Sequence, residues 1–200
     1  MATSTPWGPS QDSEKIASGI MWYSTAGHGG VHLSPSRNAL VPAYMRSEGG
    51  WYEEDCEWCI PALVFADEWQ AYENKLTWKN DRTAWRKHAE DTMRNWLPYA
   101  YEAFFNVKLQ PGQSRVKDEK DWWEAHKHEM IVVSAVCDSN YVTEDGKECV
   151  MVTACIGGRH HKTGQYCGEL RQFIVPRDEY DNRGNFGFVV NTTRYIEKVA

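Results

Sequence analysis

The first quarter of the chain alternates short apolar runs with clusters of glycine and polar residues. Residues 19–25 (GIMWYST) and 30–34 (GVHLS) are rich in aromatic and β-branched residues, a composition typical of strands. We expect these two segments to pair as a β-hairpin, followed by a short helix or turn over residues 34–46. Residues 1–18 show no such pattern and are expected to form an irregular lead-in.

The middle of the chain changes to helical spacing. Apolar residues in 52–64 (YEEDCEWCIPALV) recur three or four positions apart, which predicts a helix with one buried face. Pro61 should kink or restart that helix. Further helices are predicted after Asp81, a suitable N-cap, over 98–106 and over 117–129.

The last third of the chain has the residue pattern of β-strands. Four segments have the apolar content of buried or half-buried strands: 130–137, 148–158, 169–176 and 186–191. Because strands and helices are segregated along the chain, we predict an α+β fold. It has an N-terminal β-hairpin, a central helical block and a C-terminal antiparallel β-meander packed on the helices, with residues 144–147 (EDGK) in a hairpin loop.

Length and composition narrow the class of protein. The chain has 200 residues and no glycine- or serine-rich linker, so we expect a single domain over residues 1–200. The formal net charge is −6 and no long run of Lys or Arg occurs, so nucleic-acid binding is not indicated. No stretch approaches the roughly 18 apolar residues of a membrane span, and the N-terminus does not have the pattern of a secretion signal. We therefore expect no membrane segment and a cytoplasmic location.

The six cysteines are expected to be reduced in that location. The pair in CEWC (56–59) has the spacing of a zinc or redox motif, but no second closely spaced pair accompanies it. Cys149 and Cys155 lie in a strand pattern and are expected in the core. No phosphate-binding loop occurs either. We predict neither a metal ion nor a cofactor.

The strongest candidate site surrounds His28, which lies within GHGG. Gly27, Gly29 and Gly30 allow positive φ and would present backbone N–H groups to an anion. His28 would act as a general acid or base, a donor or a metal ligand, with the Ser24 hydroxyl nearby. The alternative is a plain hairpin turn with an exposed histidine.

An acidic segment, 49–58 (GGWYEEDCEW), is the second candidate. On a helix with about 100° per residue, Glu53 and Asp55 flank the apolar face and Glu54 points to solvent. Glu53 or Asp55 would orient the imidazole of His28 or share a cation with it. The alternative is that these carboxylates only complement the macrodipole of the first helical turn.

Two weaker candidates remain. The loop 157–166 contains Arg159 and His160, which are suited to binding an anion. Glu124 and His128 are four residues apart and would form a metal pair on one helix face. For both features a solvated surface is the simpler interpretation.

Several motifs occur in a characteristic order: TPWGPSQ, STAGHGGVHLS, GGWYEEDCEW, NWLPYAYEAF and FIVPRDEY. Together they resemble an uncharacterised domain-of-unknown-function family carried by plasmids, phages and other mobile elements. The resemblance implies a setting and not a reaction, and accessory proteins in this setting often interfere with host defence. The stretch WYSTAGHGGVHLS is also similar to the His-Gly strand of ADP-ribosyltransferases, but Gly30 stands where their hydroxyl residue would be.

Two functional hypotheses follow. The first is a binding module that inhibits or modulates a host protein, such as a defence component. The alternative is a hydrolase or transferase acting on a nucleotide-like or phosphorylated substrate, with His28 as acid or base and Glu53 or Asp55 beside it. Whether these three side chains meet in space discriminates between them.

Overall fold

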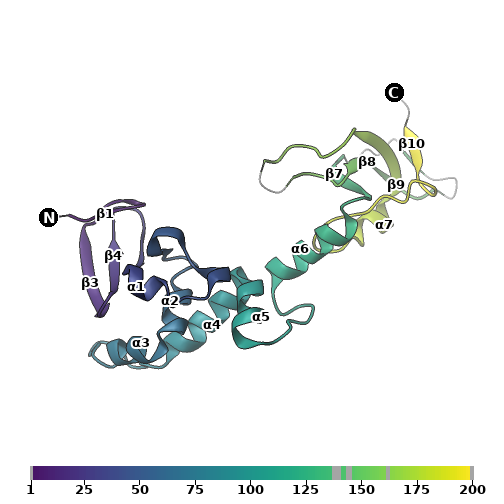
Figure 1. Ribbon diagram of the computed structural model, residues 1–200. Helices are drawn as coiled ribbons and strands as arrows, with labels where there is room; N and C mark the ends of the chain where they lie inside the picture. The colour runs from purple at the N-terminus through teal and green to yellow at the C-terminus, as the bar shows by residue number, and fades with distance from the viewer. Residues whose placement is uncertain (1, 137–140, 143–145, 161–162, 199–200) are drawn as a thin grey trace. The chain divides into compact units, whose positions relative to one another are not determined.

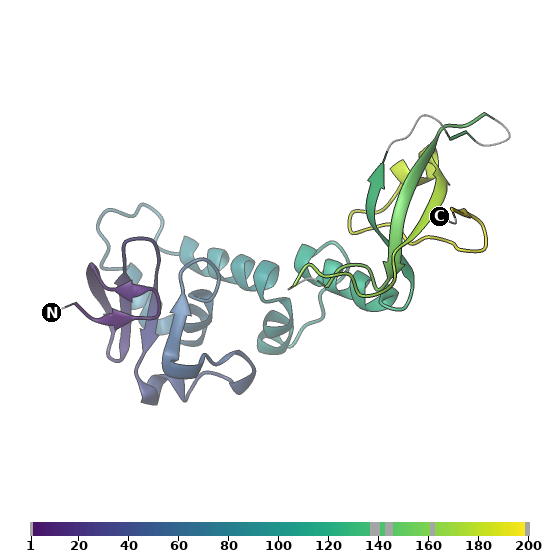
Figure 2. The ribbon, with the colours of Figure 1, turned by 90° about the horizontal axis from the view of Figure 1, so that it is seen from above.

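A computed structural model describes residues 2–136, 141–142, 146–160 and 163–198 (Figures 1 and 2). The chain folds into two compact units, Met1–Lys117 and Asp118–Ala200. Cys137 and positions 144–145 of the predicted turn lie outside the described residues. Within the described ranges, no helix has both the length and the apolar character needed to cross a bilayer.

The first unit contains a four-stranded antiparallel sheet of order β3-β4-β5-β6 and a separate short hairpin, β1-β2. The strands are β1 (Ser4–Thr5), β2 (Gly8–Pro9), β3 (Asp12–Ala17), β4 (Ile20–Ser24), β5 (Gly29–Leu33) and β6 (Trp51–Glu53). The predicted hairpin is confirmed as β4–β5, with Ile20 opposite Leu33. The expected irregular lead-in instead contains β3, which pairs with β4 along the sheet edge. Sequence pattern missed β3 because its first four residues are exposed and polar.

The helices of this unit follow the third strand of the sheet. They are α1 (Pro35–Asn38), η1 (Ala43–Met45), η2 (Glu48–Gly50), α2 (Cys59–Val64), α3 (Ala66–Glu73), α4 (Ala84–Trp96) and α5 (Pro98–Phe105). The predicted helix from Tyr52 is wrong in its first half, since Trp51–Glu53 is strand β6 and α2 begins only at Cys59. Pairing of Tyr52 with Val31 of β5 outweighs the helical spacing.

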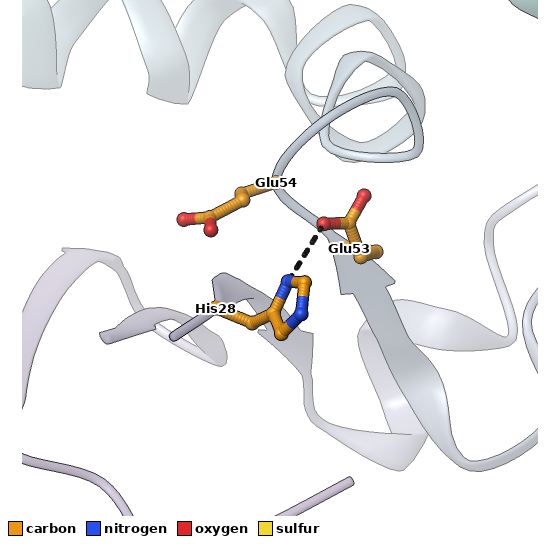
Figure 3. A group of neighbouring side chains, drawn as sticks. All are labelled: His28, Glu53 and Glu54. Atoms are coloured by element: carbon orange, nitrogen blue, oxygen red, sulfur yellow. Dashed lines mark ion pairs between the residues drawn. The ribbon is translucent and has the colours of Figure 1, made fainter. Parts of the chain in front are cut away.

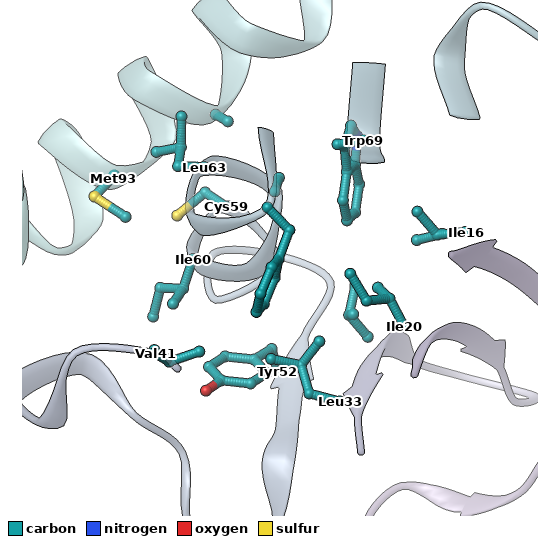
Figure 4. Close-up of a cluster of buried hydrophobic side chains, with 14 of the residues drawn as sticks. Ile16, Ile20, Leu33, Val41, Tyr52, Cys59, Ile60, Leu63, Trp69 and Met93 are labelled. Atoms are coloured by element: carbon teal, nitrogen blue, oxygen red, sulfur yellow. The ribbon is translucent and has the colours of Figure 1, made fainter. Parts of the chain in front are cut away.

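One apolar core joins the sheet to the helices (Figure 4). Ile20, Leu33 and Tyr52 contribute from the strands, and Cys59 and Met93 from α2 and α4; all five are at most 1% exposed. The Tyr52 hydroxyl donates to Asn38 Oδ1 at 2.6 Å, so the one polar atom of that ring is satisfied. Helix α2, short and apolar, contributes side chains between the sheet and α4.

The opposite face of the sheet is aromatic. The ring of His32 lies 4.2 Å from that of Trp51, and Trp7 meets Trp51 edge-on at 5.8 Å. Trp7 comes from the β1–β2 hairpin, which therefore covers part of this face. His32 packs against Trp51 on this face, and its burial lowers the pKa of the imidazole.

The second unit contains most of α6 (Arg115–His126), which begins just before the boundary, and an antiparallel sheet of order β10-β9-β8-β7. Its other elements are β7 (Met130–Val136), β8 (Cys149–Ile156), β9 (Arg171–Pro176), α7 (Arg177–Asp181) and β10 (Ile196–Lys198). The strand predicted at 186–191 is wrong: Val189 makes one isolated bridge to β7, and β10 is the fourth strand. The predicted α+β fold, with an N-terminal hairpin, helices in the middle and a C-terminal antiparallel sheet, is confirmed.

Candidate functional site

His28 lies in the loop that joins β4 to β5. The Thr25 backbone N–H donates to the His28 carbonyl at 2.7 Å, and the Thr25 hydroxyl donates to the same carbonyl at 2.8 Å. That hydroxyl also accepts the His28 N–H, at 3.2 Å. Thr25 therefore fixes the backbone from which the His28 side chain, 59% exposed, projects. Ser24 ends β4 opposite Gly29.

Two of the three glycines, Gly29 and Gly30, leave room for neighbouring atoms where a Cβ would clash. None of Gly27, Gly29 and Gly30 is among the described residues with positive φ, so the left-handed conformation that glycine allows is not adopted at these positions. A Cβ on Gly29 would lie 2.5 Å from the Glu54 carboxylate. A Cβ on Gly30 would lie 2.3 Å from the Tyr52 carbonyl and 2.4 Å from the Trp7 ring. Gly29 thus admits a carboxylate beside His28.

The acidic segment reaches His28 through strand pairing. Glu53 is the last residue of β6 and pairs with Gly30, and the Glu54 N–H donates to the Gly29 carbonyl at 3.1 Å. The Nδ1 atom of His28 lies 3.8 Å from Oε1 of Glu53 (Figure 3). One ligand atom from each of His28, Glu53 and Glu54 lies within 4.8 Å of the others. Two segments 25 positions apart in the sequence therefore converge on one cluster.

The two oxygens of Glu53 have different surroundings. Oε2 accepts the Asp55 N–H at 2.7 Å, which holds the carboxylate in place. Oε1, the oxygen that faces His28, is shielded from solvent and has no hydrogen-bond partner among the described residues. A buried carboxylate oxygen without a partner is costly, so it requires an explanation.

Asp55 does not join the cluster through its side chain. It is exposed in the turn after β6, where its backbone N–H donates to the Glu53 carboxylate. Glu54, which the helical spacing directs to solvent, is instead half-buried beside Gly29. The positions of Glu54 and Asp55 differ from the prediction because this segment is not helical. In a strand followed by a turn, successive side chains are not rotated by about 100° per residue.

The other predicted residues belong to the second unit. Arg159 donates to the Tyr166 hydroxyl at 3.0 Å and lies over its ring, and the Thr163 N–H donates to His160 Nδ1 at 3.3 Å. Both side chains are thus engaged within their own loop. Glu124 pairs with Lys127, and α6 ends at His126, so Glu124 and His128 do not share a helix face.

The two cysteines of the CEWC segment, Cys56 and Cys59, are poorly suited to a thiolate site. Cys59 Sγ donates to the Cys56 carbonyl, and burial raises the pKa of Cys59 to about 12. Burial also raises the pKa of Cys56. A thiol that resists ionisation is a poor metal ligand and nucleophile. Cys149 and Cys155 are buried, as predicted for core residues.

Residues 1–127 match the family described as a domain of unknown function, DUF7007. The chain belongs to this family. His28, Glu53 and Glu54 lie inside the DUF7007 match, whereas Arg159 and His160 lie outside it. No curated protein and no solved structure matches the chain.

Chemically, the cluster in the DUF7007 region combines one imidazole and two carboxylates on neighbouring strands and turns. Among the described residues it is the one group of three His, Cys, Asp or Glu side chains close enough to share an ion. Imidazole nitrogen and carboxylate oxygen together suit Zn²⁺, Mn²⁺ or Fe²⁺. Glu54 could be identified from the sequence only if the register between β5 and β6 were known. That register places Glu54 beside Gly29.

Proposed function

We propose that the chain is a metal-dependent hydrolase or transferase whose site is the His28–Glu53–Glu54 cluster, acting on a nucleotide-like or phosphorylated substrate. The observation that carries this proposal is the gap between His28 Nδ1 and Glu53 Oε1. At 3.8 Å the two atoms are too far apart for a hydrogen bond, yet Oε1 is buried and has no other partner among the described residues.

A shared metal ion accounts for that gap. Nitrogen and oxygen ligands lie about 2.0–2.2 Å from a bound Zn²⁺, so two ligands of one ion are separated by at most about 4.3 Å. The distance of 3.8 Å falls within this limit. Because the side chain of His28 is exposed, it can adjust to bring all three ligand atoms onto one ion without disturbing the core.

The number and charge of the ligands favour a catalytic rather than a structural ion. Catalytic zinc sites commonly use three protein ligands and leave a position for water or substrate, whereas structural sites are closed. Two carboxylates and a neutral imidazole together neutralise a divalent ion. When bound to these three residues, such an ion would lower the pKa of a coordinated water and so supply a nucleophile.

The substrate class follows from what the loop offers an anion. Gly29 and Gly30 are buried residues of strand β5, and the Glu54 carboxylate lies beside Gly29, so this backbone is poorly placed to cradle an anion by itself. Glu53 and Glu54 would repel a phosphate on their own. A divalent cation held between them would cancel this repulsion and offer an open coordination position to a phosphate oxygen.

A metal-free variant of the proposal uses His28 as the acid or base, with Glu53 as its orienting carboxylate. It needs the imidazole and Glu53 to form a direct hydrogen bond. The two variants predict different results on metal addition, and the titration below separates them.

The test is calorimetric titration of the whole protein with MnCl₂ and ZnCl₂, followed by hydrolysis of bis(p-nitrophenyl) phosphate. We expect one ion per chain, and activity that depends on it. Glu53→Gln should weaken binding by about 100-fold or more, since loss of a residue that only hydrogen-bonds to a metal ligand already costs roughly 10- to 100-fold. Asp55→Asn is the matched control and should bind normally. Equal binding by both variants contradicts the metal site.

A second candidate is the binding module: a mobile-element accessory protein that acts in the host cytoplasm on a host protein such as a defence component. Exposed aromatic side chains favour it, because aromatic residues are enriched in interface hot spots. Trp78 is 74% exposed and Trp96 is 61% exposed. This candidate predicts that Trp96→Ala abolishes capture of a host protein, while Glu53→Gln leaves capture intact. Capture that is equally strong with Trp96→Ala contradicts it.

A further inference from the structure

A pocket of about 550 Å³ opens where strands β3 and β4 meet helix α3 and the start of α4. Its volume falls in the usual range for small-molecule sites, about 300–1,000 Å³. The walls are unusually aromatic, with six tryptophan and tyrosine side chains: Trp22, Trp58, Trp69, Tyr72, Trp78 and Trp85. All of them lie within the DUF7007 match.

Several of these rings form a continuous wall. Trp58 lies 6.0 Å from Trp69, and Trp69 lies 6.3 Å from Trp85, with interplanar angles below 40°. His88 continues the row, 5.2 Å from Trp58. Trp69 and Trp85 are anchored in the core, at 5% and 6% exposed, so the wall is rigid. The Trp85 indole N–H also donates to Gln70, which fixes the ring orientation.

The pocket is negatively charged. Glu54, Glu73 and Asp81 line it, against one lysine, Lys79; no arginine is present among its lining residues. The backbone N–H of Thr83 donates to Asp81 and lowers the pKa of that carboxyl, which therefore stays ionised at neutral pH. Aromatic faces and carboxylates both attract cations and repel anions.

The chain already places one ammonium group in this environment. Lys79 Nζ lies 2.7 and 2.9 Å from the two carboxylate oxygens of Glu73, a residue only 4% exposed. The same Nζ lies 5.2 Å from the centre of the Trp78 ring. Lys79 thus shows which functional group the pocket accommodates, and it neutralises Glu73 while Glu54 and Asp81 remain.

We infer that this pocket binds an organic ammonium cation, of the methylated or quaternary type. Such ions are recognised by aromatic faces close to the charge and by a carboxylate nearby, and side chains of both kinds line this pocket. Lys79 acts as an internal competitor for part of the site. The inference does not rest on the metal site, although Glu54 borders both.

The experiment compares choline with 3,3-dimethylbutan-1-ol, which has the same shape without the charge, by calorimetry on the whole protein. Choline should bind at least about tenfold more tightly than the neutral alcohol, as expected for cation–π recognition. Equal affinity for the two compounds would overturn the inference, because it would show a merely apolar pocket. Absence of choline binding to both wild type and Lys79→Met would overturn it as well.

Three variants sharpen the result. Trp78→Ala removes an exposed ring that supports no core contact and should weaken choline binding by about tenfold. Lys79→Met removes the competitor and should strengthen it by a similar factor. Tyr44→Ala, which removes an exposed aromatic side chain outside the pocket, is the control and should change nothing. Unchanged choline binding in both Trp78→Ala and Lys79→Met would refute the assignment.

The ammonium group has two plausible sources, and a second titration separates them. If trimethyl-lysine, as its N-acetyl amide, binds more tightly than choline, the source is a modified protein side chain. If choline binds more tightly, the source is a small molecule. Glu53→Gln should leave both titrations unchanged, so failure of the metal site and failure of this pocket are distinguishable.

Discussion

Two loops of this protein look alike in sequence and differ in structure. Residues 24–30 in the first unit and residues 157–166 in the second both combine glycines with histidine and hydroxyl side chains. In the second loop, the polar groups of Arg159 and His160 contact residues of the same loop. In the first loop, His28 faces a buried carboxylate oxygen that has no hydrogen-bond partner among the described residues.

The difference shows that composition alone does not make a site. Among the described residues of the second loop, Arg159 and His160 each have a partner within the loop, which leaves these two side chains less available to a ligand. The loop at His28 is different because a neighbouring strand, β6, delivers Glu53 and Glu54 to it. Unsatisfied polar groups, rather than the number of glycines and histidines, distinguish the two.

The largest expected effect concerns stabilisation by a metal ion. At a Mn²⁺ or Zn²⁺ concentration about 100 times the Kd, binding should stabilise the wild-type protein by about 2.7 kcal/mol. His28→Ala should lose most of this gain, whereas His160→Ala should keep it. Thermal unfolding with and without metal measures both. If both variants lost the stabilisation by metal, the two loops would not differ in metal binding, which would contradict the proposal.

The next effect concerns the glycines. Gly30→Ala places a Cβ against the Tyr52 carbonyl and the Trp7 ring, and should destabilise the fold by about 1–3 kcal/mol. Gly27→Ala has nothing within 4 Å of the new Cβ and should stay within about 0.5 kcal/mol of wild type. Chemical denaturation measures both values. A Gly30→Ala protein as stable as Gly27→Ala would contradict the close packing seen at β5.

A smaller effect concerns pH. Burial lowers the pKa of His32 in the folded state, so the unfolded state binds the proton more readily. The stability that this histidine contributes is present above its unfolded pKa of about 6.5 and is lost as the pH falls through its folded pKa. Unfolding free energies at about pH 7.5 and about pH 5.5 should therefore differ more in wild type than in His32→Gln. Equal differences would show that the ring is not desolvated against Trp51.

The smallest effect is expected in the second loop. Arg159→Ala removes an exposed hydrogen bond and a contact with the Tyr166 ring, and should cost at most about 1 kcal/mol. Metal binding should be unchanged in this variant. A measurable loss of metal affinity in Arg159→Ala would give the second loop a role that its contacts do not indicate.

Much of the fold follows from the pattern along the chain. The β4–β5 hairpin, helix α5 beginning at Pro98 and strands β7, β8 and β9 were all visible as runs of suitable residues. Strands β3 and β6 were not, for physical reasons. Four of six β3 residues are exposed and polar, and β6 is only three residues long and is held by pairing with β5.

The candidate site was predictable in part. The proximity of His28 to Glu53 was proposed from residue type, and the structure brings these two side chains together. The sequence pattern could not decide whether Asp55 or Glu54 joins His28 and Glu53. That choice depends on whether the segment is a helix or a strand followed by a turn. The role of Gly29 also required the register, since only the register reveals the carboxylate that its missing Cβ admits.

The most direct test of the metal site is anomalous diffraction at the manganese edge from crystals soaked in MnCl₂. We expect one peak within coordination distance of His28 Nδ1 and Glu53 Oε1, with Glu54 as a third ligand. A crystal that shows no peak there, and instead a direct hydrogen bond between His28 and Glu53, would contradict it.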